Sequence, residues 1–448
     1  MIVKSIVTRS HNRPILLWVW LVGVAVGCQQ PLQPAAMPGT TVSYAVATMT
    51  DVMVEDVTNP PLAARFFAYA LLAGYEVIAL HNDTFPSLTG KLHGLDSLRH
   101  PAEARADIAE VAALLALWKT AAALQPTGYK HQQHITRFTD SAQKNGYPKA
   151  WLQQAHTWSD SISQQVLTYA QADGYRNISQ HTRYQPQNKP GYWYPTPPAF
   201  FPGVEPYFHT LRPMVLDSTS QYAPPPPVAY NQGKNSAFFA LLKEVYTAGS
   251  SPEEKLIASF WDCNPFAMKD MGHLLVGEKK ISPGAHWMGI CGIASQNATH
   301  PVATTLYIQT LVAIGLFDSF ISCWHEKYHS NRVRPETAVR KLIDPNWQPL
   351  LQTPPFPEYT SGHSVISTCS AVVLTHLMGQ VAFTDTIEVP YGLPPRSFSS
   401  FTQAAEEAAI SRLYGGIHFK DAISEGQVQG RRIGEHLMKA LSISKIKN

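Results

Sequence analysis

Apolar residues recur at helical spacing through most of the chain, while strand-like alternation is scarce. Apolar positions three and four residues apart place hydrophobic side chains on one face of a helix. We therefore predict an all-α fold built of helical bundles. The predicted helices span residues 61–81, 101–124, 149–172, 236–248, 252–261, 304–328, 364–378, 401–413 and 423–441.

The region from 184 to 235 breaks this pattern. It contains a run of four prolines from Pro224 to Pro227 and a dense group of aromatic residues that includes Trp193. Proline-rich segments are often flexible linkers, but the aromatic residues favour an ordered loop packed on the helices. We predict an N-terminal helical half at 51–183, this ordered loop at 184–235, and a C-terminal helical half at 236–448.

The first 50 residues predict export. A basic segment precedes a 13-residue apolar stretch, Ile15 to Gly27, which is too short for a typical membrane-spanning helix. Small residues directly before Cys28 favour a bacterial lipoprotein, anchored through lipid on Cys28 in the periplasm, outer membrane or cell surface. An ordinary signal peptide at 1–27 is the alternative. Residues 28–50 are predicted to form a tether.

Composition excludes some classes of function. The chain has 448 residues, of which 45% are hydrophobic, and can bury a large core. A net charge of +3 is too small to indicate nucleic-acid binding. The four cysteines beyond Cys28 allow three disulfide pairings, but Cys323 and Cys369 lie in apolar helical stretches and are predicted to be buried thiols. The oligomeric state stays open, a homo-oligomer included.

Three short clusters in the last third of the chain supply the groups of an anion-binding site. The first, Lys327-x6-Arg334-Pro335, places two cations seven residues apart, which is two helical turns if the helix continues to Val333. A guanidinium fork fits the oxygens of a phosphate-like ion, and lysine adds a point charge. Alone, the pattern also fits a basic helix end that complements the helix dipole.

The second cluster, Ser361-Gly362-His363, directly precedes a predicted helix. Backbone N–H groups at a helix N-terminus attract an oxyanion. Gly362 allows the backbone to come close, Ser361 can donate its hydroxyl, and His363 is a candidate acid–base group. The tripeptide alone is equally compatible with a simple N-cap turn.

The third cluster is Ser411-Arg412 at a predicted helix end, followed by His418 after a glycine turn. A neutral imidazole at His418 can bond to phosphorus or coordinate a metal oxide, and Asp421 is placed to hold its other ring nitrogen. A lone histidine in a turn is more often structural. The inference of an oxyanion site therefore depends on the three clusters occurring together.

One competing motif overlaps the first cluster. His325-Glu326-Lys327-Tyr328-His329 matches HExxH, the helix signature of zinc proteases. Lys327 would place a cation beside that metal, and residues 330–335 lack the third histidine of the extended motif. At about 100° per residue, His325 and His329 point away from an anion that Lys327 faces.

Together, the three clusters resemble the signature shared by vanadium-dependent haloperoxidases and the type 2 phosphatidic acid phosphatases. Residues 324–363 resemble the bacterial lipoprotein-type haloperoxidases in particular. The resemblance implies helical bundles around bound vanadate. It implies vanadate-binding residues Lys327, Arg334, Ser361, Gly362 and Arg412, the metal ligand His418, and the catalytic residues His363, Lys327 and His418.

The chain departs from the family pattern at two positions. Thr360 stands where the family usually has proline, and Asp421 follows His418 by three residues where the phosphatases have aspartate after four. The second departure weighs against the phosphatase, because a nucleophilic histidine needs a well-aligned partner. The resemblance also places Trp324 and Phe356 in the substrate pocket, with core packing as the alternative for both.

These observations predict an exported enzyme that binds vanadate and uses hydrogen peroxide to oxidise iodide or bromide. The alternatives are a phosphomonoesterase that works through phosphorylated His418, a zinc hydrolase, and a lipoprotein that binds an oxyanion without catalysis.

Overall fold

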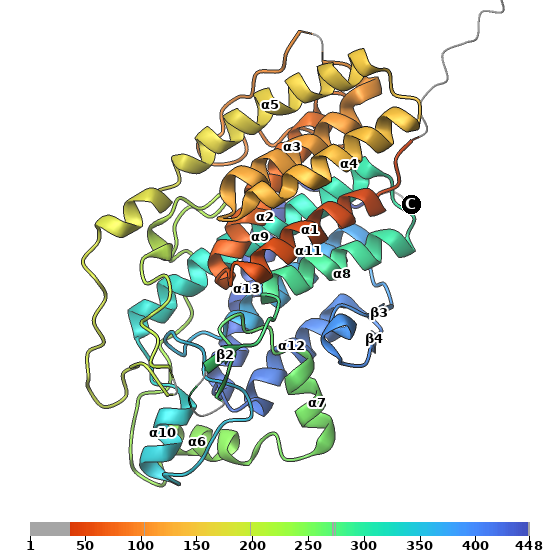
Figure 1. The fold of residues 1–448 in the computed structure, drawn as a ribbon. Helices are drawn as coiled ribbons and strands as arrows, with labels where there is room; N and C mark the ends of the chain where they lie inside the picture. Colours follow the sequence, from red (N-terminus) through yellow and green to blue (C-terminus); the bar gives the residue numbers. More distant parts are fainter. Residues whose placement is uncertain (1–35, 103, 198, 271–272, 274, 447–448) are drawn as a thin grey trace, which may run out of the picture.

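Helices dominate the computed structural model, which describes residues 36–446 apart from 103, 198, 271–272 and 274 (Figure 1). The predicted signal peptide and Cys28 lie outside the described residues. Within them lie thirteen α-helices: α1 (Thr40–Glu55), α2 (Pro60–Ala79), α3 (Ala109–Leu124), α4 (His131–Lys144), α5 (Lys149–Gln171), α6 (Ala237–Thr247), α7 (Pro252–Phe260), α8 (Pro283–Asn297), α9 (Val302–Ser330), α10 (Pro335–Leu342), α11 (Gly362–Met378), α12 (Phe401–Tyr414) and α13 (Lys420–Ala440). The all-α prediction is confirmed.

Strands are short and peripheral in the described part of the chain. Strand β1 (Met268–Asp270) pairs antiparallel with β2 (Leu275–Gly277), and β3 (Phe383–Asp385) pairs antiparallel with β4 (Arg396–Phe398). Each ribbon has two strands of three residues, so neither forms a layer of the fold.

Each of the nine predicted segments contains an observed helix, but α1, α4, α8 and α10 were not predicted. Helix α4 is mostly polar and buries only His131, Ile135 and Ala142, so its apolar stripe is thin. Helix α8 carries three glycines, and α10 has only eight residues. Helix α1 corrects the predicted tether, because residues 40–50 belong to this helix and bury Val42, Ala45 and Met49 among others.

The core is centred on α2 and α9. Both are long and apolar enough to span a membrane, but 94% and 100% of their most apolar windows are buried inside the protein. Helix α9 packs against α2, α8 and α11. Figure 1 shows α3, α4 and α5 toward one end of the molecule and α6, α7 and α10 toward the other. The main core cluster includes the buried free thiols of Cys323 and Cys369 predicted above, and a separate cluster packs α6 and α10 against α12 and the start of α13.

The segment 184–235 is held against α9 by buried contacts. The carboxylate of Asp318, inside α9, accepts hydrogen bonds from three consecutive backbone N–H groups, those of Met214, Val215 and Leu216, at 2.7, 2.8 and 3.0 Å. Val204 of the same segment accepts bonds from Trp324 Nε1 at 3.1 Å and from a tyrosine hydroxyl of α9. The segment therefore covers the C-terminal part of α9, where the first cluster begins.

A stripe of glycines lets α13 lie close to α11. A Cβ on Gly430 would lie 2.1 Å from the carbonyl oxygen of Val365, and one on Gly434 would lie 2.9 Å from a side chain of α11. At Gly426 a Cβ would lie 3.0 Å from the Ser361 carbonyl oxygen. The stripe therefore also determines how closely α13 approaches the loop that carries the second cluster.

Replacing Gly430 with alanine should force α13 and α11 apart, because the contact is with backbone that cannot rotate away. We expect the Gly430→Ala variant to lose about 1–3 kcal/mol of unfolding free energy, measured by urea denaturation and by the thermal midpoint. Gly284→Ala in α8 is the matched control, since its Cβ would meet nothing closer than 3.6 Å. Equal stability of the two variants would contradict the close packing.

Candidate active site

Lys327 and Arg334 meet through a break between two helices. Lys327 lies in the last turn of α9, which ends at Ser330 and is followed by Asn331 in the left-handed conformation with φ 49°. Arg334 is the N-cap residue of α10. The condition for two helical turns between the cations, a helix that continues to Val333, is therefore not met. The sharp turn, rather than two helical turns, brings the cations together.

Backbone carbonyl groups surround both cations. Lys327 Nζ donates to the carbonyl oxygens of Pro357, Glu358 and Thr360 at 3.1, 3.1 and 2.5 Å. Arg334 donates from Nε to the Phe356 carbonyl and from Nη1 to the Ile417 carbonyl, both at 2.9 Å. Burial lowers the pKa of Lys327 to about 8 and that of Arg334 to about 10.

Among the described residues, no carboxylate forms an ion pair with these cations. Lys327, Arg334 and Arg412 are at most 1% exposed, and none of them forms an ion pair within the described part of the chain. Arg334 Nη2 is buried without a hydrogen-bond partner among the described residues. Because isolated buried charge is costly, three such cations favour an anionic ligand.

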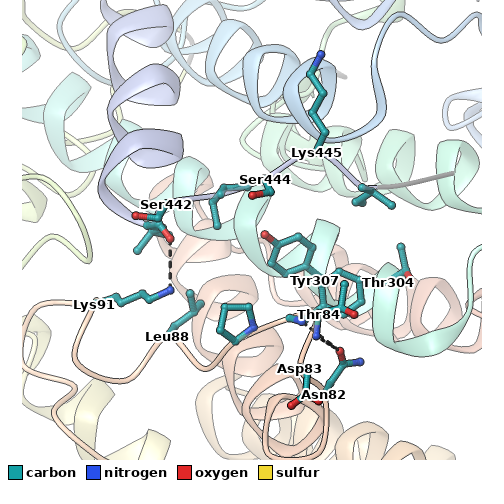
Figure 2. Close-up of a pocket in the computed structure, with 15 residues that line it drawn as sticks. Asn82, Asp83, Thr84, Leu88, Lys91, Thr304, Tyr307, Ser442, Ser444 and Lys445 are labelled. Carbon is teal, nitrogen blue, oxygen red and sulfur yellow. Dashed lines mark hydrogen bonds between the residues drawn. The ribbon is translucent and has the colours of Figure 1, made fainter.

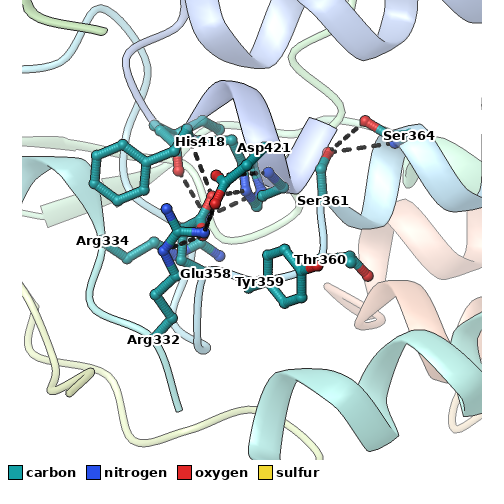
Figure 3. A network of polar contacts seen from close by, with 12 residues as sticks. Arg332, Arg334, Glu358, Tyr359, Thr360, Ser361, Ser364, His418 and Asp421 are labelled. Atoms are coloured by element: carbon teal, nitrogen blue, oxygen red, sulfur yellow. Dashed lines mark hydrogen bonds and ion pairs between the residues drawn. The ribbon is translucent and has the colours of Figure 1, made fainter. Parts of the chain in front are cut away.

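His418 is oriented by Glu358. Its Nδ1 lies 2.8 Å from Glu358 Oε1, which also accepts a bond from the Phe419 N–H at 2.9 Å (Figure 3). Since Oε1 is the acceptor, we assign the proton of His418 to Nδ1. Nε2 then offers its lone pair and accepts from Arg334 Nη1 at 3.1 Å. Burial and the nearby arginines and lysine hold the pKa of His418 well below its usual range, so the ring is neutral.

The prediction that Asp421 holds the second nitrogen of His418 is wrong. Asp421 pairs instead with Arg332 Nη1 at 2.7 Å, and Arg332 Nε lies 3.4 Å from Glu358 Oε2. The sequence did contain a signal for Glu358, which is the only acidic residue between Asp344 and Asp385 and precedes Ser361 by three positions.

The second cluster forms the N-terminus of α11. Ser361 is the N-cap residue, and its hydroxyl accepts from the Ser364 N–H at 3.3 Å. His363 Nε2 is buried without a partner in the described residues, and burial together with Arg412 lowers the pKa of His363 well below its usual value. The departure at Thr360 also has a structural role, because its hydroxyl donates to Gln429 Oε1 at 2.7 Å.

A narrow cavity collects predicted groups from the second and third clusters, while Lys327 and Arg334 of the first cluster lie behind its Phe356 wall. Its walls include Gly362, His363, Arg412 and His418, and also Trp324, Phe356 and Asn264. Phe356 lies against both remaining cations, with Lys327 Nζ 5.1 Å and the Arg334 guanidinium 5.0 Å from its ring centre. Asn264 was not predicted, since nothing in its local sequence marks it. Its buried Nδ2 lacks a partner among the described residues and supplies a further donor.

A more voluminous cavity lies elsewhere. It holds about 660 Å³ and lies between the loop after α2, part of α9 and the last described residues (Figure 2). Lys91 crosses its rim to reach the Leu441 carbonyl at 3.4 Å. It contains neither a histidine nor an arginine, so we place the chemistry in the smaller, buried cavity.

The HExxH motif does not assemble a metal site among the described residues. His325 Nδ1 lies 3.4 Å from the Thr219 hydroxyl, and the His325 ring contacts His209 and His329. Neither His325 nor His329 lines the oxyanion cavity. Among the described residues, neither lies close enough to two further His, Cys, Asp or Glu side chains to form a metal site with them. Both therefore point away from the cavity.

Comparison with known proteins decides the family. A bacterial vanadium-dependent iodoperoxidase of known structure matches with a TM-score of 0.85 and 40% sequence identity, over 91% of this chain and 97% of that one. The chain belongs to the vanadium-dependent haloperoxidases. The family model described as the VCPO second helical-bundle domain matches residues 307–444, which include every residue of the three clusters. Vanadate is the cofactor that this membership implies.

More distant haloperoxidases share the fold. The apo and holo structures of a bacterial vanadium-dependent chloroperoxidase match with TM-scores of 0.63 and 0.62 at 15% identity. Each alignment covers 86% of this chain, and 95% and 93% of the other chain respectively. None of the curated proteins matches the sequence.

The structure predicts that Glu358, and not Asp421, supports vanadate binding. The Glu358→Gln variant should bind vanadate about 10- to 100-fold more weakly, because the carboxylate that orients the His418 ring loses its charge. Asp421→Asn is the matched control and should change the dissociation constant by no more than a few-fold. Titration calorimetry with vanadate measures both. A larger loss in Asp421→Asn would reverse the assignment.

Proposed function

We propose that this protein binds vanadate in the cavity around His418 and uses hydrogen peroxide to oxidise halide, iodide in the first place. The observation that carries the proposal is the set of three buried cations that lack carboxylate partners in the described residues. They surround a neutral histidine whose Nε2 lone pair is held in place by Glu358. Membership of the haloperoxidase family supports the same assignment.

Each site residue has a distinct task in this proposal. Lys327, Arg334 and Arg412 neutralise the oxyanion, and His418 Nε2 is its ligand. Lys327 must exchange one of its carbonyl contacts for the anion, because its three N–H groups already have acceptors. Ser361 and Gly362 complete the site at the N-terminus of α11, where backbone N–H groups favour negative charge.

The reaction consumes a proton, and His363 is placed to supply it. One halide ion, one hydrogen peroxide and one proton give one hypohalous acid and one water. When bound, vanadate supplies a Lewis-acidic centre that activates the peroxide. His363 lines the same cavity with an unpartnered Nε2, and an anion bound there offsets the Arg412 charge that helps to lower the His363 pKa, so that the ring can then take up a proton and deliver it.

Iodide is the halide best supported by the apolar cavity wall and by the similarity to a bacterial iodoperoxidase. Trp324, Phe356, Phe320 and Phe266 line the cavity. A large, weakly hydrated anion loses less on entering such an apolar space than a small, strongly hydrated one does. The iodoperoxidase that is 40% identical to this chain is consistent with the same choice.

The proposed location is outside the cytoplasm, with a lipid anchor on Cys28. The basic and apolar segment that ends at this cysteine supports the proposal. Detergent-phase partitioning of the full-length protein should be lost in a Cys28→Ser variant, and retention of partitioning would refute the anchor.

The activity is tested by offering vanadate, peroxide and iodide beside p-nitrophenyl phosphate. We expect iodide oxidation that requires vanadate, and its loss to background in His418→Ala, since the ligand atom is removed. His325→Ala and His329→Ala are matched controls that remove histidines outside the cavity and should retain turnover. Phosphatase turnover without iodide oxidation would favour the phosphomonoesterase. Loss of activity in the control variants would favour the zinc site.

The pKa of Lys327 predicts a dependence of vanadate affinity on pH. The pKa of Lys327 lies at about 8 in the free protein, so above that pH the neutral amine must first take up a proton from solution before it can bind the anion as a cation. Affinity should therefore fall as pH rises above about 8, by up to about tenfold per unit. The arginine of a Lys327→Arg variant keeps its charge in this pH range, so the variant should lack this part of the pH dependence of vanadate affinity. Ionisation of vanadate itself affects both proteins equally, so parallel pH curves would contradict the prediction.

A further inference from the structure

A second buried cluster of reactive side chains adjoins the oxyanion cavity, whose wall includes its member Cys263. Cys263 follows α7, His286 lies in α8, and Glu388 precedes a short 3-10 turn after β3. All three side chains are buried. Cys263 Sγ lies 3.4 Å from His286 Nδ1 and 3.9 Å from Glu388 Oε1, and the last two atoms are 3.2 Å apart. Three distant segments thus bring a thiol, an imidazole and a carboxylate to one point.

These distances match the edges of a metal coordination tetrahedron. With zinc bonds of about 2.3 Å to sulfur and about 2.0 Å to nitrogen and oxygen, tetrahedral angles separate the ligand atoms by about 3.3 to 3.6 Å. The observed separations of 3.2, 3.4 and 3.9 Å bracket that range. A zinc ion therefore fits between the three atoms with little movement of the side chains.

The surroundings of His286 resemble those of a metal-bound histidine. Asp385 Oδ2 lies 2.7 Å from His286 Nε2, and this contact turns Nδ1 toward Cys263 and Glu388. Metal-ligating histidines typically have such a carboxylate on the second nitrogen. The Trp261 ring stacks on the imidazole at 4.6 Å, which restricts its rotation. The orientation of the ligand is thus set by residues outside the cluster.

The charge of the cluster also favours a cation. Glu388 and Asp385 are two buried carboxylates, and His286 is the one basic side chain that contacts either of them among the described residues. A divalent ion would balance the two carboxylates and a Cys263 thiolate, leaving His286 neutral. Glu388 also lines a solvent-open cavity of about 570 Å³, which provides a route for the ion and room for a water ligand.

We propose that Cys263, His286 and Glu388 bind one zinc ion, with Asp385 orienting His286 and water completing the coordination. The site joins the loop after α7 to α8 and to the segment after β3. That loop also carries Asn264 and one wall of the oxyanion cavity. The zinc site therefore supports the cavity wall that contains Cys263 and Asn264, and it shares no residue with the proposed vanadate-binding set or with the HExxH motif.

Cobalt provides a test that does not depend on catalytic activity. The full-length protein is treated with a chelator and titrated with Co²⁺ alone. We expect one equivalent to bind with the visible bands of tetrahedral cobalt and a near-ultraviolet thiolate-to-cobalt charge-transfer band. Native protein purified without chelator should contain about one zinc per chain by elemental analysis.

Two variants and a matched control locate the ion. Cys263→Ser should abolish the charge-transfer band, and Glu388→Gln should weaken cobalt binding at least about tenfold. Cys291→Ser removes another fully buried thiol outside the cluster and should keep both signals. Circular dichroism establishes whether each variant is folded. If Cys263→Ser unfolds, the cobalt affinity of Glu388→Gln, which retains the thiol, still tests the site.

The outcomes separate a metal site from a hydrogen-bonded cluster. Absence of the charge-transfer band in wild-type protein at excess Co²⁺ would mean that the three side chains only bond to one another, and would overturn the proposal. A band that persists in folded Cys263→Ser, or unchanged affinity in Glu388→Gln, would also overturn it. Vanadate binding, measured separately by calorimetry, reports on the proposed function and not on this site.

Discussion

The burial of three positive charges without a compensating carboxylate is the constraint around which the site is built. Within the described residues, Lys327 and Arg334 are surrounded by carbonyl oxygens of the 356–360 loop and the turn before His418. Carbonyl dipoles stabilise a buried cation but leave its net charge intact. The protein thereby retains positive charge for a ligand, which an ion pair with glutamate or aspartate would have removed.

Glu358 acts on the histidine, while Asp262, a carboxylate in the cavity wall, pairs with Lys280. Glu358 Oε1 contacts the His418 ring and the Phe419 N–H, and Oε2 lies near Arg332. Its carboxylate oxygens therefore contact none of the three cations proposed to bind the anion. It also fixes which nitrogen of His418 faces the cavity. A single acid thus orients the ligand atom without neutralising the cations beside it, and Arg332 limits the cost of burying that acid.

Much of the fold could be predicted from the sequence, because apolar periodicity is a local property. The nine predicted helices include both core helices, α2 and α9. Periodicity failed in α4, which buries few residues, in the short α10, and also in the buried helices α1 and α8. It also could not show that α13 approaches α11 through Gly430, since a glycine stripe has no apolar signature of its own.

The sequence by itself determined which chemical groups the site contains, since residue type and order identify Lys327, Arg334, Arg412 and His418 as candidates for an oxyanion site. Only the tertiary structure decided how they are connected. The break after α9 brings Lys327 and Arg334 together. Tertiary packing places the carboxylate of Glu358, sixty positions before His418 in the sequence, within hydrogen-bond distance of His418 Nδ1. Closeness in the sequence favoured Asp421 as the hydrogen-bond partner of His418. Hydrogen bonds depend on distance in space, however, and long-range packing sets that distance.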